Sequence, residues 1–241
     1  MNPNQLLCFG CMRLLNTPGE ICSHCGHDNR SRKNGLGMLG ECVPANQYQI
    51  GRTLGRGGFG VTYVGYDLQL ANRVAIKEYY PAHLVLRGKD DMSLSAIEGG
   101  EEGYRKGYQR ALRESRMAAS LRSIDGVVQV YNVFTANNTV YIVMEYVEGP
   151  TLSRCVEDSP EPIHPRDASA MPAPVAEALS RLHREKVIHR DVKPDNIIIP
   201  ASVISIGDRA FSGCDSLILT VTKSSYAENY AKDNFLHHTT R

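Results

Sequence analysis

The sequence predicts an α+β fold: an antiparallel sheet with one helix, then a partly helical portion, with a small cysteine-rich module in front. Segments rich in β-branched and aromatic residues recur between about residues 48 and 147, separated by turns that carry glycine or asparagine. Two segments, about 104–122 and 175–185, space their apolar residues as helices do. Two C-x-x-C pairs lie within residues 8–25.

Length and composition describe an ordinary globular chain. Its 241 residues suit one large domain or two small ones, and it is 42% hydrophobic and 22% charged. A formal net charge of +1 gives no electrostatic argument for nucleic acid or an anionic membrane as a partner. Apolar runs stay far short of the ~20 residues that span a bilayer, and the N-terminus has no signal-peptide pattern. We therefore expect a cytoplasmic protein.

Residues 5–30 hold the two C-x-x-C pairs, which ten residues separate. Each pair can form a tight turn, and two such turns place four thiolates at tetrahedral Zn²⁺ distances. The expected zinc ligands are Cys8, Cys11, Cys22 and Cys25. His24 and His27 are alternative ligands, and redox chemistry is an alternative role, although a redox site needs only one pair in a βαβ context. The segment resembles the zinc ribbons of many bacterial proteins, which implies a structural or adaptor role and a protein partner.

A linker is expected over residues 31–47, which are rich in glycine and basic residues and have little periodicity. Strand-like residues 48–54 then lead into the run Gly55-Arg-Gly-Gly-Phe-Gly60. Glycine lets a backbone approach phosphates and point its N–H groups at them. Because β-branched and aromatic residues follow, the loop is expected to join two strands, whereas in dinucleotide-binding folds it would open a helix.

The strand after this loop ends in Val74-Ala-Ile-Lys77. Taken alone, Lys77 is most simply a surface lysine at a strand end. Residues 81–103 are polar and glycine-rich, and we expect an inserted loop there. The helix over about 104–122 carries Glu114 close to two arginines, so a solvated charge is the alternative to a functional role.

Two further strands are expected over residues 127–134 and 139–147, joined by a turn at Asn137-Asn138. The helix at 175–185 has apolar residues at i, i+4 and i+7 and leads to a short charged segment. Several prolines before this helix make a longer one harder to sustain.

That charged segment reads His-Arg-Asp-Val-Lys-Pro-Asp-Asn from His189. Pro194 cannot donate a ladder hydrogen bond, so a loop is expected. The loop offers a carboxylate at Asp191, an ammonium at Lys193 and an amide at Asn196. Phosphoryl transfer uses a carboxylate to orient the attacking hydroxyl, and an amide oxygen to hold a metal ion at the nucleotide phosphates. An ordinary charged turn is the alternative.

Together, the glycine-rich run, the V-A-I-K strand and the H-R-D loop resemble the protein kinase family, and the lysine of the loop resembles its serine/threonine branch. For about residues 48–199, the resemblance implies a kinase-like N-lobe, an antiparallel sheet plus one helix, and a partial helical C-lobe. It implies a transferase that uses ATP and Mg²⁺ to phosphorylate a protein serine or threonine.

The resemblance also implies a role for each motif residue. ATP is expected to contact Leu54, Gly55, Gly57, Gly58, Gly60, Ala75 and Lys77. Glu114 is expected to pair with Lys77. Adenine is expected to lie against a hinge made of Met144, Glu145 and Val147. Asp191 orients the substrate hydroxyl, Lys193 steadies the γ-phosphate and Asn196 holds Mg²⁺.

The resemblance stops after Ile199. A kinase next shows D-F-G, whose Asp holds the main metal ion, and later A-P-E, but residues 200–241 contain neither. Asp208 is the nearest substitute ligand. Residues 200–241 instead resemble a remnant of a bacterial leucine-rich repeat, and Cys214 belongs to that pattern. We therefore expect weak or no catalysis, and the alternative function is an inactive nucleotide-binding or zinc-ribbon interaction module.

Overall fold

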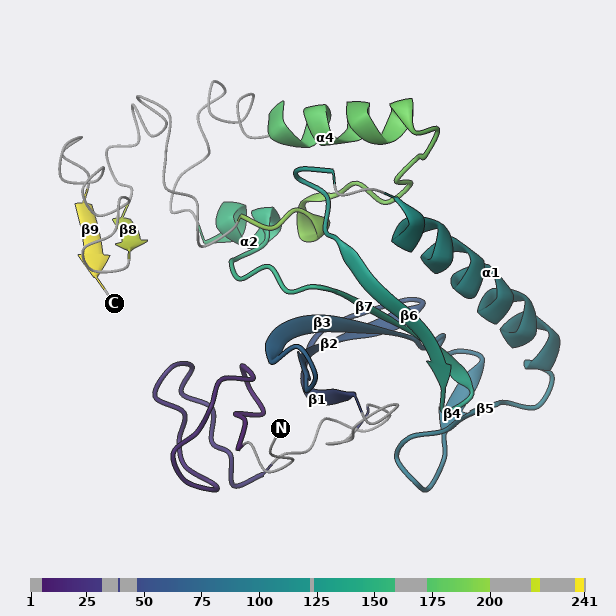
Figure 1. The fold of residues 1–241 in the computed structure, drawn as a ribbon, viewed down its shortest axis with the longest axis horizontal. Coiled ribbons are helices and arrows are strands. Elements are labelled where there is room, and N and C mark those ends of the chain that lie inside the picture. Colours follow the sequence, from purple (N-terminus) through teal and green to yellow (C-terminus); the bar gives the residue numbers. More distant parts are fainter. Residues whose placement is uncertain are drawn as a thin grey trace. The chain divides into compact units, whose positions relative to one another are not determined.

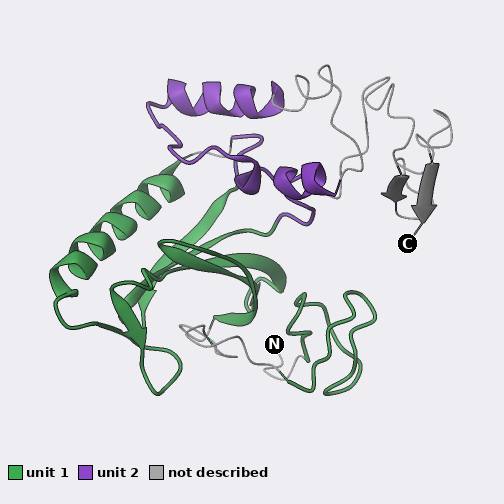
Figure 2. Ribbon diagram, turned by 180° about the vertical axis from the view of Figure 1, so that it is seen from behind, with its two compact units in different colours: residues 1–123, 128–146 green, residues 124–127, 147–241 purple. Residues whose placement is uncertain are grey.

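The computed structural model describes residues 6–31, 39, 47–121, 124–158, 173–199, 218–221 and 237–240. The chain divides into two compact units, shown in green and purple in Figure 2: residues 1–123 with 128–146, and residues 124–127 with 147–241. Within the described residues, no helix is both long enough and apolar enough to cross a membrane.

A five-stranded antiparallel sheet forms the centre of the first unit (Figure 1). Its strands are β1 (Tyr48–Gly57), β2 (Gly60–Asp67), β3 (Asn72–Tyr79), β6 (Val130–Ala136) and β7 (Thr139–Glu145), in the spatial order β1-β2-β3-β7-β6. The predicted turn between β6 and β7 is confirmed, since Asn137 and Asn138 have φ of 52° and 59°. Asparagine tolerates this left-handed backbone, which matches the twist of a hairpin.

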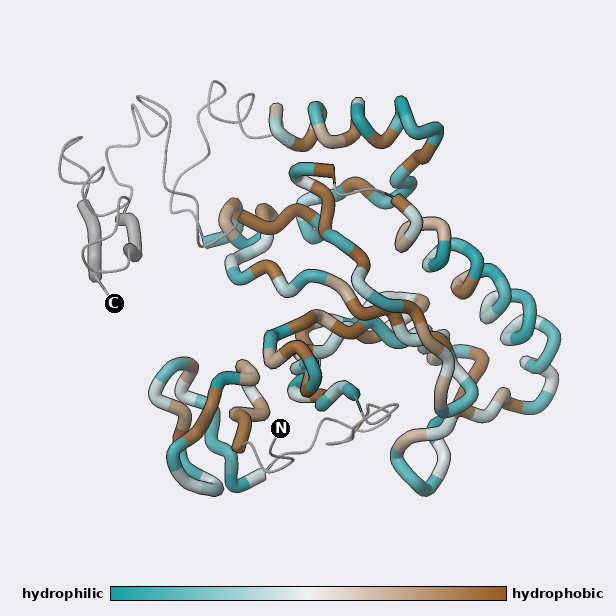
Figure 3. The backbone as a smooth tube through the Cα atoms, viewed as in Figure 1, coloured by the Kyte–Doolittle hydropathy of each residue, from teal (hydrophilic) through white to brown (hydrophobic). Residues whose placement is uncertain are grey.

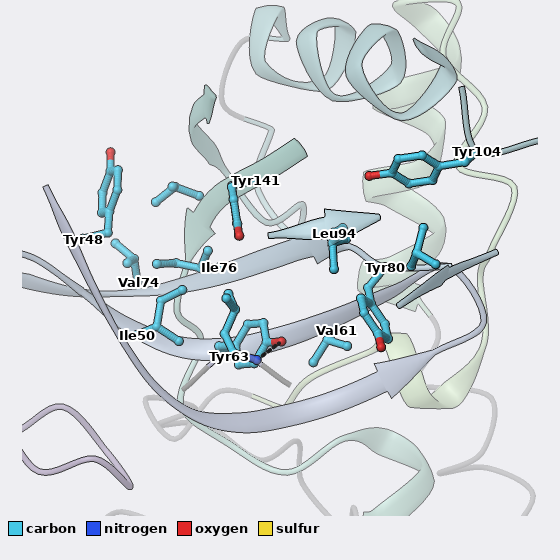
Figure 4. Packing of buried hydrophobic residues seen from close by; sticks show 13 residues of the cluster. Tyr48, Ile50, Val61, Tyr63, Val74, Ile76, Tyr80, Leu94, Tyr104 and Tyr141 are labelled. Carbon is cyan, nitrogen blue, oxygen red and sulfur yellow. Dashed lines mark hydrogen bonds between the residues drawn. The ribbon is translucent and has the colours of Figure 1, made fainter. Parts of the chain in front are cut away.

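The core lies on one face of the sheet, where alternate side chains of neighbouring strands meet. Figure 4 shows this packing, in which fully buried Val61 and Tyr63 of β2 lie near Ile76 of β3 and Tyr141 of β7. In Figure 3 the central strands are largely hydrophobic, whereas α1 (Glu101–Ser120) is mostly hydrophilic. The sheet therefore provides most of the apolar surface of this unit, and the helix adds a narrow stripe.

α1 contacts β6 and β7 through a stripe that includes the buried Tyr104 and Ser115. The Tyr104 ring stacks on Tyr79, with ring centroids 5.9 Å apart. At Gly107, a Cβ would lie 1.9 Å from the Tyr79 hydroxyl, so this helix position requires glycine. The helix begins three residues earlier than predicted, because Glu101 and Glu102 provide the negative charge that favours a helix N-terminus.

The prediction of a plain loop over residues 81–103 is wrong, because part of the segment forms a hairpin of β4 (Val85–Arg87) and β5 (Leu94–Ala96). Between its strands, the carboxylate of Asp90 accepts hydrogen bonds from the Ser93 hydroxyl and from the amides of Met92 and Ser93. These bonds hold the pKa of Asp90 at about 2. Strands of three residues are too short for a visible alternation, so the sequence gives little sign of them.

The second unit has α2 (Leu152–Glu157), α4 (Ala173–Arg184) and a short 3₁₀ turn, η2 (Pro194–Asn196). α4 confirms the helix predicted at 175–185, with Ala178 and Leu182 buried. The predicted repeat remnant lies outside the described residues, apart from a parallel pair of β8 (Ile218–Val221) and β9 (His237–Thr240). Asp208 and Cys214 are also outside them.

Candidate nucleotide, catalytic and metal sites

The glycine-rich run forms a tight hairpin between β1 and β2, as predicted, with Gly57 opposite Gly60. A Cβ on Gly55 or Gly58 would meet nothing within 4 Å, so the loop surface there is open to a ligand. Gly60 differs, because a Cβ would lie 2.7 Å from the carbonyl oxygen of Glu78 and 3.4 Å from Cε of Lys77. The loop therefore lies directly against the end of β3 that carries Lys77.

Lys77 lies between Thr62 of β2 and Ile142 of β7 in the strand register, and its side chain is exposed. Among the described residues it forms no ion pair. Glu114 is exposed on α1 and accepts from Nε of Arg110 at 2.9 Å. The expected ion pair between Lys77 and Glu114 is therefore not formed in this structure, because a neighbour one helical turn away occupies the carboxylate.

The residues of the first unit that are predicted to lie near adenine come from three strands. Ala75 of β3 is the register partner of Met144 of β7, and Ala75 is 7% exposed. Leu54 of β1 is partly exposed. The amide of Glu145 donates to the carbonyl of Gln129 at 2.9 Å. Val147 belongs to the second unit.

The charged loop of the second unit brings together the three predicted catalytic residues. The side-chain amide of Asn196 donates to the carbonyl oxygen of Asp191 at 2.8 Å and to its carboxylate at 2.9 Å. Nζ of Lys193 lies 3.7 Å from the other carboxylate oxygen. These side chains are exposed, and Arg190 adopts φ of 66° before them. A carboxylate, an ammonium and an amide thus converge on one exposed spot, which suits binding of an anionic phosphate and its metal ion.

Backbone hydrogen bonds join this loop to the start of α2. The Leu152 amide donates to Ile197 at 2.7 Å, and the Ile199 amide donates to Pro150 at 2.9 Å. Thr151 caps α2 by accepting from the Arg154 amide and also forms a β-bridge with Ile198. These contacts hold the end of the charged loop in place.

The four predicted zinc ligands come together in the first unit. All Sγ atoms lie within 4.8 Å of one another, with 3.6 Å between Cys8 and Cys25 and 3.8 Å between Cys11 and Cys22. Four sulfurs at about 2.3 Å from a tetrahedral Zn²⁺ are about 3.8 Å apart. The arrangement therefore fits zinc. Burial opposes ionisation of Cys22, but the amides of Cys25 and His24 favour the thiolate and lower its pKa to about 7.

Donors around the sulfurs complete this cluster. The Gly10 amide lies 3.3 Å from Sγ of Cys8, and the side-chain amide of Asn29 lies 3.6 Å from the same sulfur. The two histidines lie outside the group of four, since His24 contacts Arg13 and the His27 ring packs against Phe9. Sequence reasoning missed Asn29, because nothing in the local pattern shows that a residue so near the chain's linker folds back onto the metal-binding turns.

Comparison with known proteins identifies the family to which the chain belongs. The protein kinase domain family matches residues 48–227. The chain belongs to the protein kinase family. This match extends beyond Ile199, the residue after which we found no further kinase motif in the sequence. The two units therefore contain parts of one kinase domain, with the five-stranded sheet in the first and the charged loop from His189 in the second.

Bacterial serine/threonine kinases are among the similar proteins. This kinase chain is 32% identical over 162 residues to serine/threonine-protein kinase PrkC of Bacillus subtilis, covering 67% of the chain and 22% of PrkC. It is 35% identical over 162 residues to serine/threonine-protein kinase PknB of Mycobacterium tuberculosis, covering 66% of the chain and 23% of PknB. The chain thus spans under a quarter of these relatives.

The solved structure of PpkA-294 in its apo form matches with a TM-score of 0.62 and 31% identity, covering 68% of this chain and 58% of that one. The kinase domain of PknI from Mycobacterium tuberculosis matches with a TM-score of 0.50 and 24% identity, covering 67% of this chain and 57% of that one. These matches confirm the predicted kinase-like fold, with an antiparallel sheet and few helices.

Proposed function

We propose that this kinase chain binds ATP with Mg²⁺ and transfers the γ-phosphate to a serine or threonine hydroxyl of a protein. The geometry of the catalytic loop carries the proposal, because Asn196 holds the Asp191 carboxylate and Lys193 lies 3.7 Å from it. The serine/threonine kinases among its relatives support the same acceptor class. We also propose that the chain consists of a zinc ribbon at residues 5–30, a linker at 31–47, a partial kinase domain at 48–199 and a remnant of a leucine-rich repeat at 200–241.

In this proposal the glycine-rich hairpin covers the phosphates of ATP with its backbone amides, and Lys77 contacts the α- and β-phosphates. Pairing of Lys77 with Glu114 requires that Glu114 leave Arg110. The adenine base lies among Leu54, Ala75 and Met144, and the backbones of Glu145 and Val147 hydrogen-bond to its edge.

Asp191 orients the attacking hydroxyl and takes its proton, while Lys193 neutralises charge on the γ-phosphate. The side-chain oxygen of Asn196 would hold Mg²⁺, since the hydrogen bonds to Asp191 use only its Nδ2 and orient the amide. No D-F-G occurs in residues 200–241, and loss of the main metal ligand removes several kcal/mol of transition-state stabilisation. We therefore propose that transfer is slow, and Asp208 is the candidate replacement ligand.

Transfer of radiolabelled γ-phosphate to a generic acceptor protein such as casein tests the proposal. We expect slow, Mg²⁺-dependent labelling that falls by about 10²-fold or more in Asp191→Asn, which lacks the general base. Asp195→Asn is the matched control, since this exposed carboxylate lies in the same turn. Equal labelling by wild type and Asp191→Asn would mean that the loop does no chemistry. ATP binding without any labelling would favour the inactive nucleotide-binding module.

A second proposal is that residues 5–30 form a zinc ribbon with one structural Zn²⁺ per chain. The four converging sulfurs carry it. Metal analysis of the purified chain should give one zinc per molecule, and Cys25→Ser should lower that content. Cys155→Ser is the control, because Cys155 lies on α2 in the other unit. A full zinc content in Cys25→Ser would contradict the four-cysteine site.

A further inference from the structure

The cysteine module and the sheet share one buried cluster. Leu7 and Met12 of the module are 0% and 1% exposed, and they pack with Val64 and Tyr66 of β2. Tyr146, directly after β7, packs against the same cluster. The chain's own sheet therefore covers the apolar side of the module that Leu7 and Met12 form.

Polar contacts fix the same docking at β1. The Arg52 amide donates to the carbonyl oxygen of Phe9 at 2.8 Å, and Nε of Arg52 donates to the carbonyl oxygen of Gly10 at 2.8 Å. At Gly51, a Cβ would lie 2.3 Å from Cε of Met12 and 2.5 Å from the Phe9 oxygen. Glycine at this position allows the module to approach the strand.

The residues of the module that contact the sheet are next to the cysteines in the chain, so the cysteine cluster determines their backbone conformation. Phe9 and Gly10 lie between Cys8 and Cys11, and Met12 follows with φ of 56°. A segment this small has little core of its own, so a bound metal provides much of its folding free energy. Loss of the metal should therefore release the contacts to β1 and β2.

Two of the docked positions adjoin the nucleotide-binding residues. Arg52 is two residues before Leu54, on the strand that continues into the glycine-rich hairpin. Tyr146 follows Glu145 at the hinge and lies beneath the guanidinium of Arg73, which is 5.1 Å from the ring centroid. The module thus bonds to β1 two residues before Leu54, and Tyr146, directly after Glu145, packs against the cluster that the module shares with β2.

We propose that metal occupancy of the four cysteines controls nucleotide binding, because the metal-bound module docks on the chain's own sheet and holds β1 and the hinge in place. The inference rests on the proposed ATP-binding function. Coupling between two sites is reciprocal, so ATP should tighten zinc binding by the same factor by which zinc tightens ATP binding.

The test measures the dissociation constant of Mg·ATP for the full chain with zinc bound, after removal of zinc by a chelator, and after zinc is added back. We expect affinity to fall by about fivefold or more without zinc and to recover with it, as for a typical allosteric coupling. The thermal midpoint, followed without ATP, should fall and recover in parallel. Competition with a metal indicator should show tighter zinc binding when ATP is present.

Gly51→Ala tests the docking itself, since its Cβ would lie 2.5 Å from the backbone oxygen of Phe9 and would force the module away from β1, while all four cysteines remain in the sequence. This variant should keep its zinc but bind ATP equally with and without it. Gly103→Ala is the control, because the added Cβ meets Leu84 at an ordinary 3.5 Å. Arg52→Gln removes the hydrogen bond from Nε of Arg52 to the Gly10 carbonyl oxygen and should reduce the effect of zinc on ATP affinity. It serves as the second variant if Gly51→Ala does not fold.

Equal ATP affinity of the wild type with and without zinc would overturn the coupling while leaving the proposed function intact. A zinc-loaded wild type that binds no ATP would instead contradict the proposed function. Retention of the full zinc effect in both Gly51→Ala and Arg52→Gln would show that docking does not transmit it.

Discussion

Glu78 is fully buried in β3, and its carboxylate is satisfied by three partners from different strands. Arg87 of β4 donates at 2.6 Å, and the hydroxyls of Tyr63 and Tyr141 donate at 2.9 and 3.2 Å. Burial is the main cause that raises the pKa of Tyr63 well above its usual range, and the negative charge of Glu78 adds to the effect. This cluster lies on the opposite face of β3 from Lys77, so it anchors the strand that presents Lys77.

Replacement of Glu78 by Gln should lower the free energy of unfolding by about 3–5 kcal/mol, because Arg87 is then a buried charge without its counter-ion. Chemical denaturation measures the change. Glu102→Gln is the matched control, since Glu102 pairs with Lys106 where both side chains are about 70% exposed, and its loss should stay within about 0.5 kcal/mol. A similar small change in both variants would contradict the structural role of the buried pair.

At the scale of elements, α1 is held to the sheet by aromatic packing more than by aliphatic residues. Tyr79 stacks on Tyr104, and the Tyr104 hydroxyl donates to the carbonyl oxygen of Asn138. Burial is the main cause that raises the pKa of Tyr104 to about 12. Gly107 provides the space for the Tyr79 ring, although glycine by itself weakens a helix.

Two glycines of α1 should therefore respond oppositely to alanine. Gly107→Ala should destabilise the protein by about 1–3 kcal/mol, because the new methyl group overlaps the Tyr79 hydroxyl. Gly103→Ala should stabilise it by about 0.5–1 kcal/mol, since alanine has the higher helix propensity and space is available. Thermal or chemical denaturation of both variants, compared with the wild type, measures the two changes. If both substitutions stabilise the protein, α1 does not pack on Tyr79 as described.

At the scale of the whole molecule, the proposed chemistry is divided between the two units. The glycine-rich hairpin and Lys77 belong to the first, whereas Asp191, Lys193 and Asn196 belong to the second. ATP that binds the folded chain should stabilise it, because the unfolded form does not bind the ligand.

ATP with Mg²⁺ should raise the thermal midpoint of the purified chain, whereas ATP with a chelator of Mg²⁺ should raise it little, since the metal neutralises the phosphates. ATP at 100 times its dissociation constant adds about 2.7 kcal/mol to the free energy of unfolding. Lys77→Met should lose most of this shift. An equal shift with and without Mg²⁺ would indicate that no metal ligand, neither Asn196 nor Asp208, takes part in binding.

Local pattern was sufficient for much of the fold and of the candidate site. The strands of the five-stranded sheet, both longer helices, the Asn137-Asn138 turn, the charged loop from His189 and the four cysteines were predicted from residues close together in the sequence. Such features depend on backbone preference and spacing within a few residues, which the sequence displays directly.

Long-range packing decided what the sequence could not. Alternation with the inward-facing Val74 and Ile76 indicates that Glu78 points inward, but its partner Arg87 comes from a hairpin too short to predict. The docking of the cysteine module on β1 likewise depends on contacts between distant segments. The pairing of Glu114 with Arg110 is instead a local contact within one turn of α1. The residues of the sequence show which chemical groups this kinase chain carries. Which of those groups meet follows only from the folded chain, because contacts between distant segments depend on how the whole sheet packs.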